Sequence, residues 1–287
     1  MMSVTRLDAP FGVEATGLDI SAGLDDAGMR ELAGLLHDNR LLVIRDQELS
    51  KDQYLAFGRR WGAPIPHALD HLRMPGYPEL MAVGNTTEKD RREEIRNGAV
   101  FWHTDQSYEA EPSTATMLYC RMAPEQGGET QVADLAAAYD ALDDAMKARL
   151  DGLVATHLYG AASGRGDENI AAPIVTKGQA DKLPSVRHRI ARPHPVTGRI
   201  TLYAVAGTPY GIEGLADVEA QDLLDDLKAH ALQARFIYRH KYRVGDIAIW
   251  DTAQTLHSGV PIEVATGRRD SRLLWRISVR GAPEVCA

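Results

Sequence analysis

The chain has 287 residues, of which 44% are hydrophobic and 25% are charged, with 32 Lys and Arg against 40 Asp and Glu. This composition excludes a disordered chain, a collagen and a disulfide-stapled mini-protein, and it supplies enough apolar residues for a large core. The formal net charge of -8 argues against a nucleic-acid partner, because no broad basic field is available to attract a phosphate backbone.

The two cysteines and the N-terminus bear on the cellular compartment. Cys120 lies in an apolar run and Cys286 near the C-terminus, which is not the pattern of a disulfide framework. The first residues lack the apolar stretch of a signal peptide, and no window is long and apolar enough for a membrane span. We therefore expect a cytoplasmic protein. No repeat or linker divides the chain, so residues 1–287 are predicted to form one domain.

The first half of the chain begins with helical signals and continues with strand signals. Apolar residues at helical spacing predict helices over residues 21–40 and 50–61, the second after an N-cap serine. Short β-rich runs separated by Pro and Gly predict strands. The predicted strands cover residues 41–44, 99–102, 115–119 and 130–133.

The second half contains two further helices and then returns to strands. Helices are predicted over about residues 135–150 and 218–233, and strands over 236–244, 246–250 and 272–279. Residues 160–195 are rich in Gly, Pro and charge, which is typical of a lid or a mobile loop. Many short strands without a βαβ rhythm predict an all-β core with helical cover, either a sandwich or a jelly roll. No phosphate-binding GxxxxGK[ST] motif is present.

The segment FWHTDQSY, residues 101–108, carries the strongest local chemical signal. On an extended strand His103 and Asp105 project from the same face, where they can start a metal site or simply form a structural pair. His257 is the best third candidate, because the strand over residues 246–250 leads it into a turn at Ser258-Gly259. Two histidines and one carboxylate with open positions are expected of non-haem Fe(II) oxygenases, although zinc accepts the same ligands.

The last predicted strand carries two arginines on one face. Arg272 and Arg276 alternate with an apolar set that includes Trp275 and Ile277 and that predicts contact with the core. The arginines are either a solvated edge or anion receptors in a cavity, a role that suits the planar guanidinium.

Taken in order, these motifs resemble the taurine dioxygenase and 2,4-D dioxygenase-like family of Fe(II)/2-oxoglutarate-dependent oxygenases. The resemblance implies a double-stranded β-helix, or jelly roll. It rests on LLVIRDQELS at 41–50, FGRRWG at 57–62, WHTD at 102–105, GGET at 127–130 and the stretch from Gly245-Asp246 through Trp250-Asp251 to His257. The chain departs from the family at Thr252-Ala253, where Asn-Arg is usual, and in the longer interval between His257 and Arg272.

The resemblance implies a role for each matching residue around the cofactors. His103, Asp105 and His257 would bind Fe(II). Thr130 and Arg272 would hold the distal carboxylate of 2-oxoglutarate, the co-substrate used with O2. Arg268 and Arg269 are rivals of Arg272, but their neighbours Gly267 and Asp270 predict an exposed turn.

Substrate residues are also implied by the resemblance. Arg276 would lie near the metal-side carboxylate or an anionic group of the prime substrate, and His67 falls where taurine-oxidising members place a substrate histidine. Trp102 is the aromatic residue that precedes the metal motif, with a role in packing or in substrate contact. Ala99 stands where a taurine-oxidising enzyme has a polar residue, which argues against taurine itself. Further pocket candidates are Tyr108, Tyr203, Thr208 and Tyr210.

The resulting hypothesis is a dioxygenase that oxidises, by default hydroxylates, a C–H bond of a small anionic molecule or an intermediate of secondary metabolism, releasing succinate and CO2. Asp105 argues against a halogenase, because halogenating relatives lack this carboxylate. Desaturation, epoxidation and ring expansion stay open. The alternatives are a sulfonate dioxygenase, a non-catalytic jelly-roll sensor and a metallohydrolase. We expect a homo-oligomer, either a dimer or a tetramer, without a nucleic-acid or membrane partner.

Overall fold

A computed structural model describes residues 2–67, 70–159 and 184–286. Its largest sheet has the order β1-β2-β3-β15-β7-β17-β6-β5, with β4 paired to β17. These strands are β1 Ser3–Arg6, β2 Val13–Thr16, β3 Leu41–Ile44, β4 Ala63–Pro64, β5 Arg73–Met74, β6 Tyr77–Gly84, β7 Ala115–Met122, β15 Ile247–Asp251 and β17 Leu273–Arg280. All their pairings are antiparallel except that of β2 with β3.

Three smaller sheets complete the β structure. The one that matters most for the site has the order β14-β8-β16, and the others are β10-β9-β13 and β11-β12. Their strands are β8 Thr130–Asp134, β9 Val154–His157, β10 Val186–Arg189, β11 Ala191–Pro193, β12 Ile200–Leu202, β13 Pro209–Ile212, β14 Ile237–His240 and β16 Thr255–Gly259.

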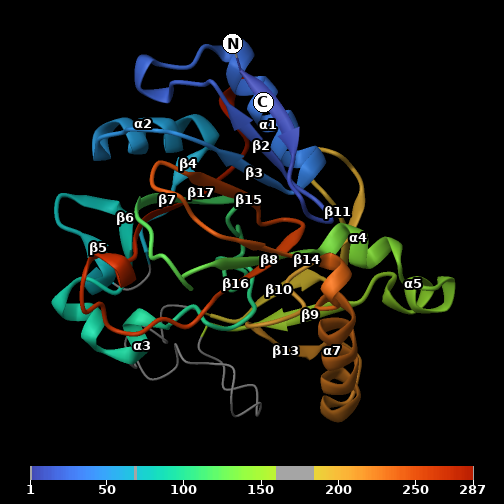
Figure 1. Cartoon of the computed structure of the whole chain (residues 1–287). Helices are drawn as coiled ribbons and strands as arrows, with labels where there is room; N and C mark the ends of the chain where they lie inside the picture. The colour runs from blue at the N-terminus through green and yellow to red at the C-terminus, as the bar shows by residue number, and fades with distance from the viewer. Residues whose placement is uncertain (1, 68–69, 160–183, 287) are drawn as a thin grey trace.

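Helices cover the outer faces of the sheets. In Figure 1, α1 and α2 lie above the large sheet near both chain ends, and α4, α5 and α7 lie beside and below the small sheets. The helices are α1 Asp26–Asn39, α2 Lys51–Trp61, α3 Glu93–Arg96, α4 Leu135–Asp140, α5 Asp144–Leu150 and α7 Asp217–Ala231.

Three apolar clusters define the layers of the molecule. One packs α1 and α2 against the large sheet, through residues such as Met29, Phe57 and Ile277. Another packs α4 and α7 against the outer side of the small sheets. The third lies between the two main sheets, where Val132 of β8 meets Trp250 of β15. Burial of these faces supplies most of the driving force for this arrangement.

Several sequence predictions are confirmed in detail. The jelly-roll expectation fits two mainly antiparallel sheets packed around an inner cluster. The strand at 41–44 has the predicted bounds, and Ser50 forms a capping box with Gln53 at the start of α2. The helix predicted from residue 21 begins at Asp26, because the Asp25 side chain caps it by accepting from the Gly28 N–H.

Other predictions are wrong in their bounds. Residues 99–102 do not form a strand, since the only pairing in that region is an isolated bridge between His103 and His257. The helix predicted over 135–150 is two helices, because Asp143 interrupts the pattern by capping α5. The strand predicted over 236–244 narrows to residues 237–240.

The predicted lid over residues 160–195 has two parts. Residues 160–183 lie outside the described residues, whereas residues 186–189 and 191–193 form the strands β10 and β11. Both cysteines are free, as expected. Among the described residues, no helix has the length and apolar character that a membrane span requires.

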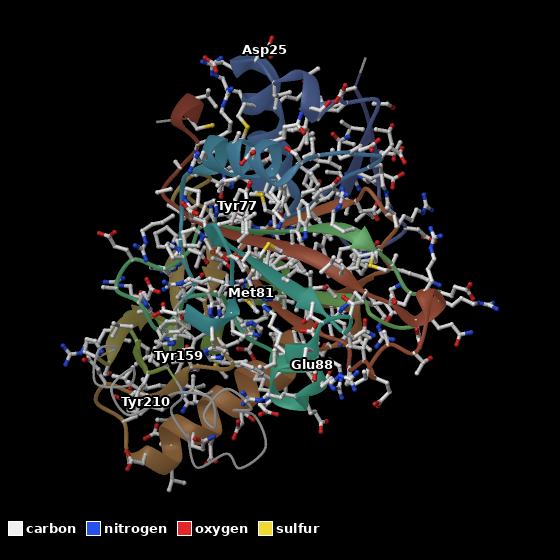
Figure 2. The ribbon with its side chains drawn as sticks, turned by 90° about the vertical axis from the view of Figure 1, so that its left-hand side faces the viewer. Asp25, Tyr77, Met81, Glu88, Tyr159 and Tyr210 are labelled. Atoms are coloured by element: carbon white, nitrogen blue, oxygen red, sulfur yellow. The ribbon has the colours of Figure 1, made fainter. Side chains whose placement is uncertain are left out.

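Figure 2 shows the molecule from the side of β6, whose Tyr77 and Met81 are labelled along the strand. Met81 and Val83 of this strand line the main cavity, and Tyr159 faces the same cavity from the end of β9. The cavity is therefore lined from the large sheet and, at Tyr159, from the end of β9.

Candidate active site

A cavity of about 170 Å³ lies between the two main sheets and collects most of the residues singled out in the sequence. His103, Asp105 and His257 line it together with Arg272 and Arg276. Its remaining walls are largely apolar and come from Leu72, from β6 and β7, and from the segment that includes α3.

The backbone holds His103 and His257 directly opposite each other. The His103 N–H donates to the His257 carbonyl at 3.0 Å, and the His257 N–H donates to the His103 carbonyl at 2.9 Å. His257 therefore lies within β16 and not in a turn after β15, as the sequence had suggested. Gly207 packs against this pair, since a Cβ there would approach the His103 Cβ to 2.8 Å. The bridge fixes the spacing of the two imidazoles.

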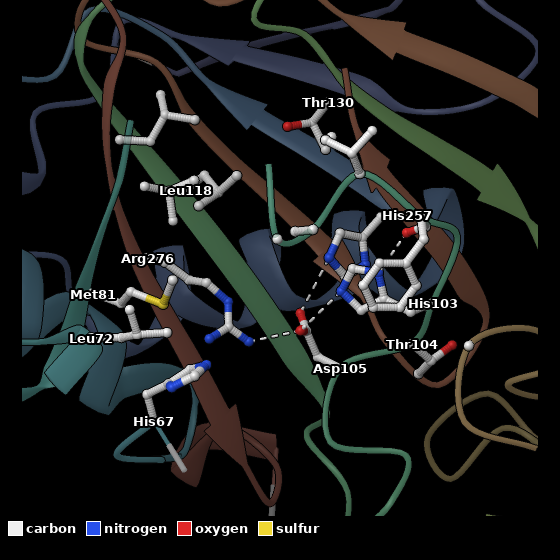
Figure 3. A pocket seen from close by; sticks show the side chains of 18 of the residues that line it. His67, Leu72, Met81, His103, Thr104, Asp105, Leu118, Thr130, His257 and Arg276 are labelled. Atoms are coloured by element: carbon white, nitrogen blue, oxygen red, sulfur yellow. Dashed lines mark hydrogen bonds and ion pairs between the residues drawn. The ribbon is translucent and has the colours of Figure 1, made fainter. Parts of the chain in front are cut away.

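Asp105 reaches the same point from the turn that follows His103. Its Oδ1 lies 3.7 Å from the His103 Nε2 and its Oδ2 lies 3.6 Å from the His257 Nε2. The ligand atoms of the three residues all lie within 4.8 Å of one another. Figure 3 shows the carboxylate facing both rings. The expected convergence is thus present, although a turn and not an extended strand produces it.

The hydrogen bonds of this group leave one inward-facing carboxylate oxygen without a partner. The His103 Nδ1 lies 2.8 Å from the Phe101 carbonyl, so this nitrogen carries the proton and Nε2 presents its lone pair to Asp105. The Asp105 Oδ2 is buried and has no hydrogen-bond partner. A buried carboxylate oxygen without a partner is costly, so the site is built to receive a positive group.

Burial and neighbouring charges set the protonation of the three residues. Burial lowers the pKa of His103, and burial together with the nearby His103 lowers the pKa of His257 to about 3. Burial alone would raise the pKa of Asp105, but Arg276 and the two histidines hold it well below its usual value. At neutral pH the group therefore has two neutral imidazoles and a carboxylate, as metal binding requires.

Arg276 lies beside Asp105 in the cavity. Its Nη2 donates to the Asp105 Oδ1 at 2.7 Å, and it makes no other hydrogen bond to a described residue. In Figure 3 the guanidinium points from β17 toward Asp105, with His67, Leu72 and Met81 on the same side. The half-buried His67 lines the cavity. This side of the cavity therefore offers unused N–H donors next to apolar surface.

Arg272 occupies a separate, buried part of the same cavity. Its side chain is 4% exposed, its Nη1 donates to the Gly128 carbonyl at 3.3 Å, and its Nε has no partner. No carboxylate of a described residue forms an ion pair with it, and burial lowers its pKa. Gly128 is required here, because at φ +74° a Cβ would lie 3.1 Å from the Arg272 Cδ. A buried guanidinium without an internal anion is a receptor for one.

Thr130 lies close to this guanidinium and has a fixed hydroxyl. The Tyr242 hydroxyl donates to the Thr130 Oγ1 at 2.9 Å, which leaves the threonine proton available to a ligand. Burial raises the pKa of Tyr242 well above its usual value, so the phenol remains a donor. By contrast, Arg268 and Arg269 are exposed in the turn before β17, and Arg269 pairs with Glu125.

The predicted substrate residues fall into two groups. Tyr108 and Thr208 line the cavity, but the Thr208 hydroxyl is already engaged with Ser107 at 2.7 Å and with the His157 Nδ1 at 2.8 Å. Trp102 packs against the cluster beneath α4 and α7 and does not line the cavity. Tyr203 is buried away from it, and the exposed Tyr210 binds Ser185.

Some cavity residues had no signal in the sequence. Tyr159 packs against Tyr108 with ring centroids 4.4 Å apart, while Leu72 and Met81 form the opposite wall. Each looks like an ordinary core residue, because only the fold shows which apolar side chains face an open space.

A second group of the same composition lies outside this cavity. His37 of α1, His194 and Asp251 also bring potential ligand atoms within 4.8 Å of one another. Here, however, the Asp251 Oδ2 is 2.7 Å from the His37 Nδ1 and 2.9 Å from the His194 Nε2. The His194 Nδ1 accepts from the Val196 and Thr197 N–H groups, so its Nε2 carries the proton. These contacts are hydrogen bonds of a structural network.

A jelly roll that carries two histidines and a carboxylate beside a cavity, with an unpaired buried arginine, has the architecture of a non-haem iron oxygenase. Comparisons with known proteins agree with this class. Residues 3–278 match the family described as "Taurine catabolism dioxygenase TauD, TfdA family".

Individual relatives cover nearly the whole chain. The 2,4-dichlorophenoxyacetate dioxygenase of Cupriavidus pinatubonensis, described as alpha-ketoglutarate-dependent, is 31% identical over 90% of this chain and 92% of its own. The (S)-phenoxypropionate/alpha-ketoglutarate-dioxygenase of Sphingobium herbicidovorans is 32% identical, over 98% and 95%. The crystal structure of AAD-2 in complex with Mn(II) and N-oxalylglycine is similar with a TM-score of 0.79, 28% identity and coverage of 98% of both chains.

The chain therefore belongs to the TauD/TfdA family of dioxygenases. The sequence prediction of an enzyme that depends on Fe(II), 2-oxoglutarate and O2 is confirmed, in preference to a non-catalytic sensor.

Proposed function

We propose that His103, Asp105 and His257 hold the Fe(II) of this dioxygenase through the two Nε2 atoms and the Asp105 Oδ2. The observation that supports this assignment most strongly is the unpartnered, buried Oδ2 that faces two neutral imidazoles. Arg276 occupies Oδ1, so the carboxylate would bind through one oxygen. Such a set leaves open positions on one side, as an oxygenase requires.

In the same proposal, Arg272 and Thr130 receive the distal carboxylate of 2-oxoglutarate. The Arg272 guanidinium is the buried cation that has no internal anion, and the Thr130 hydroxyl adds a neutral donor beside it. Arg268, the rival arginine, is exposed and does not line this cavity.

Bound Fe(II) and 2-oxoglutarate supply, with O2, the oxidant for a substrate C–H bond, and the co-substrate leaves as succinate and CO2. The chain's own residues bind and orient the substrate. Arg276 offers its remaining N–H groups to an anionic group, and the half-buried His67 lies on the same side. The apolar walls exclude water around the reacting carbon.

We propose that the substrate is an aromatic or bulky apolar acid of the aryloxyalkanoate type. Tyr108, Tyr159 and Met81 provide surfaces for a ring, and Ala99 adds no polar group to the cavity. The phenoxy acids named for two relatives have this chemistry. Taurine would place a small zwitterion among these apolar walls.

The co-substrate assignment is tested by anaerobic titration with Fe(II) and 2-oxoglutarate, read from the visible charge-transfer band. We expect Arg272→Ala to weaken 2-oxoglutarate binding about 100-fold, because a charged hydrogen-bonded pair is lost. The matched control Arg268→Ala should leave the titration unchanged. The opposite ranking would transfer the role to Arg268.

The substrate assignment is tested by measuring succinate release with 2,4-dichlorophenoxyacetate, (S)-2-phenoxypropionate and taurine. We expect either phenoxy acid to stimulate release well above the rate without substrate, and taurine to do so least. Arg276→Leu should remove the stimulation while background release of succinate persists. Stimulation by taurine alone would favour a sulfonate dioxygenase.

We further propose that residues 1–287 act as one domain, in a homo-oligomer located in the cytoplasm and without a nucleic-acid partner. The net charge of -8 and a core shared by both halves of the chain support this view. Light scattering on the purified protein measures the assembly.

A further inference from the structure

Gln106 directly follows Asp105 and has a side chain that the proposed iron and co-substrate do not use. The residue is 4% exposed and lines the cavity together with Asp105 and Tyr108. Its Oε1 is buried without a hydrogen-bond partner, and its carboxamide forms no hydrogen bond with any described residue.

The nearby serine hydroxyls behave differently, because each has a partner inside the protein. The Ser107 hydroxyl donates to the Thr104 carbonyl at 2.9 Å, and the Ser113 hydroxyl donates to the Asp105 carbonyl at 3.0 Å. Leaving a buried carboxamide unpaired costs about 1–3 kcal/mol. Apart from the proposed iron ligand Asp105, the turn therefore leaves this carboxamide, and not its serine hydroxyls, open toward the cavity.

The backbone of Gln106 is also held in an uncommon conformation. Its φ of +49° makes it one of four non-glycine residues with positive φ among the described residues. The turn maintains this geometry through the Glu109 N–H, which donates to the Gln106 carbonyl at 2.9 Å. Such strain persists where the surrounding structure fixes it, and it is concentrated at ligand sites.

We propose that Gln106 is a specificity-determining residue whose carboxamide binds a neutral hydrogen-bonding group, a hydroxyl or an amide, on the prime substrate. A carboxamide offers both a donor and an acceptor, which matches these groups. The anionic ligands already have Arg272 and Arg276. The inference rests on the proposed function, in which the charged end of the substrate lies at Arg276. The substrate is then an acid with a second, uncharged polar group.

The first test compares matched phenoxyacetates that carry a hydroxyl or a methyl group at the same ring position. Their dissociation constants are measured anaerobically, from the change that each causes in the charge-transfer band of the Fe(II)- and 2-oxoglutarate-loaded protein. We expect at least one hydroxyl isomer to bind about tenfold more tightly than its methyl counterpart. Gln106→Met should abolish this preference, whereas the exposed control Gln126→Met should retain it.

The second test is the Tm of the protein without ligands. Methionine has a similar length and meets the same backbone constraint, so Gln106→Met isolates the carboxamide. If Gln106 is reserved for a ligand, removing its unpaired oxygen leaves the Tm unchanged or raises it. A structural role, including one satisfied by a buried water, predicts a fall of several degrees.

The proposal is overturned if the wild-type protein shows no preference for any hydroxyl isomer, if Gln106→Met keeps the preference, or if its Tm falls. If no phenoxyacetate changes the band, the aryloxy substrate class is rejected. The Tm comparison then decides the role of Gln106, with a fall against it and an unchanged or raised Tm in its favour.

Discussion

The protein contains two groups that each consist of two histidines and one aspartate. The groups differ in the hydrogen bonds that the aspartate already accepts. In the group of His103, Asp105 and His257, one carboxylate oxygen is unpaired, and the group lies at a cavity. In the group of His37, His194 and Asp251, the aspartate receives both histidines at hydrogen-bond distance.

Composition and proximity therefore do not identify a metal site. The Asp251 carboxylate also accepts hydrogen bonds from the Ala253 N–H and from the Gln254 amide, so neither of its oxygens is left unpaired for a cation. Asp105 receives Arg276 at its Oδ1, whereas its Oδ2 accepts no hydrogen bond from a described residue. The count of hydrogen bonds that the carboxylate already accepts separates a structural group from a binding group.

The largest expected effect comes from removing an imidazole from each group. His257→Ala should eliminate the Fe(II)·2-oxoglutarate charge-transfer band and substrate-dependent succinate release, a loss greater than the roughly 10–100-fold typical of residues behind the metal ligands. His194→Ala should keep the band while lowering the Tm. Titrations of both variants at a temperature where each is folded provide the comparison. A persistent band in His257→Ala would refute the iron assignment.

The next largest effect concerns stability. Asp251→Ala leaves the buried His194, the half-buried His37 and the Gln254 amide without their acceptor, so we expect the free energy of unfolding to fall by about 3–5 kcal/mol. Urea denaturation monitored by Trp fluorescence measures this change. The Asp251→Asn variant keeps the shape of the side chain, so its free energy of unfolding should fall less.

Lowering the pH should reveal how much the Asp251 hydrogen-bond network contributes to stability. Burial alone would raise the pKa of Asp251, but hydrogen bonds from His194 and His37 lower it from 3.8 to about 2. A lowered pKa in the folded state gives stability that is complete above about pH 4 and is lost as the pH falls toward 2. The contribution is about 2 kcal/mol. Unfolding free energies measured across this range should decline less steeply for Asp251→Asn. Equal slopes would contradict the proposed role of the network.

The smallest effect is expected from replacing His37 in the group of His37, His194 and Asp251. His37→Leu removes one hydrogen bond to Asp251 but also removes a buried Nε2 that has no partner. We therefore expect a loss of about 1 kcal/mol in the free energy of unfolding, with unchanged iron binding. Denaturant titration and the charge-transfer band measure the two quantities. A loss of the band would mean that the two groups are coupled.

The sequence predicted the fold class, four of the nine large-sheet strands (β3, β7, β15 and β17) and the shared face of Arg272 and Arg276 at the last strand, because alternation and capping are local signals. It did not predict that residues 99–102 remain irregular, because pairing partners are set by the fold. Motif resemblance brought together His103, Asp105 and His257, whereas nothing local distinguished Tyr159 or Gln106. Their positions depend on a cavity formed by segments far apart in the chain.

The reciprocal backbone bridge between His103 and His257 also affects how the protein is made. During synthesis, a chain that has not reached residue 257 has only one side of this bridge, and Arg272 and Arg276 emerge later still. Long-range pairings of this kind form late in folding. The nascent chain can therefore assemble the complete oxidising site only after its final strand has joined the sheet. A polypeptide that stops before residue 272 lacks both arginines and cannot start the chemistry.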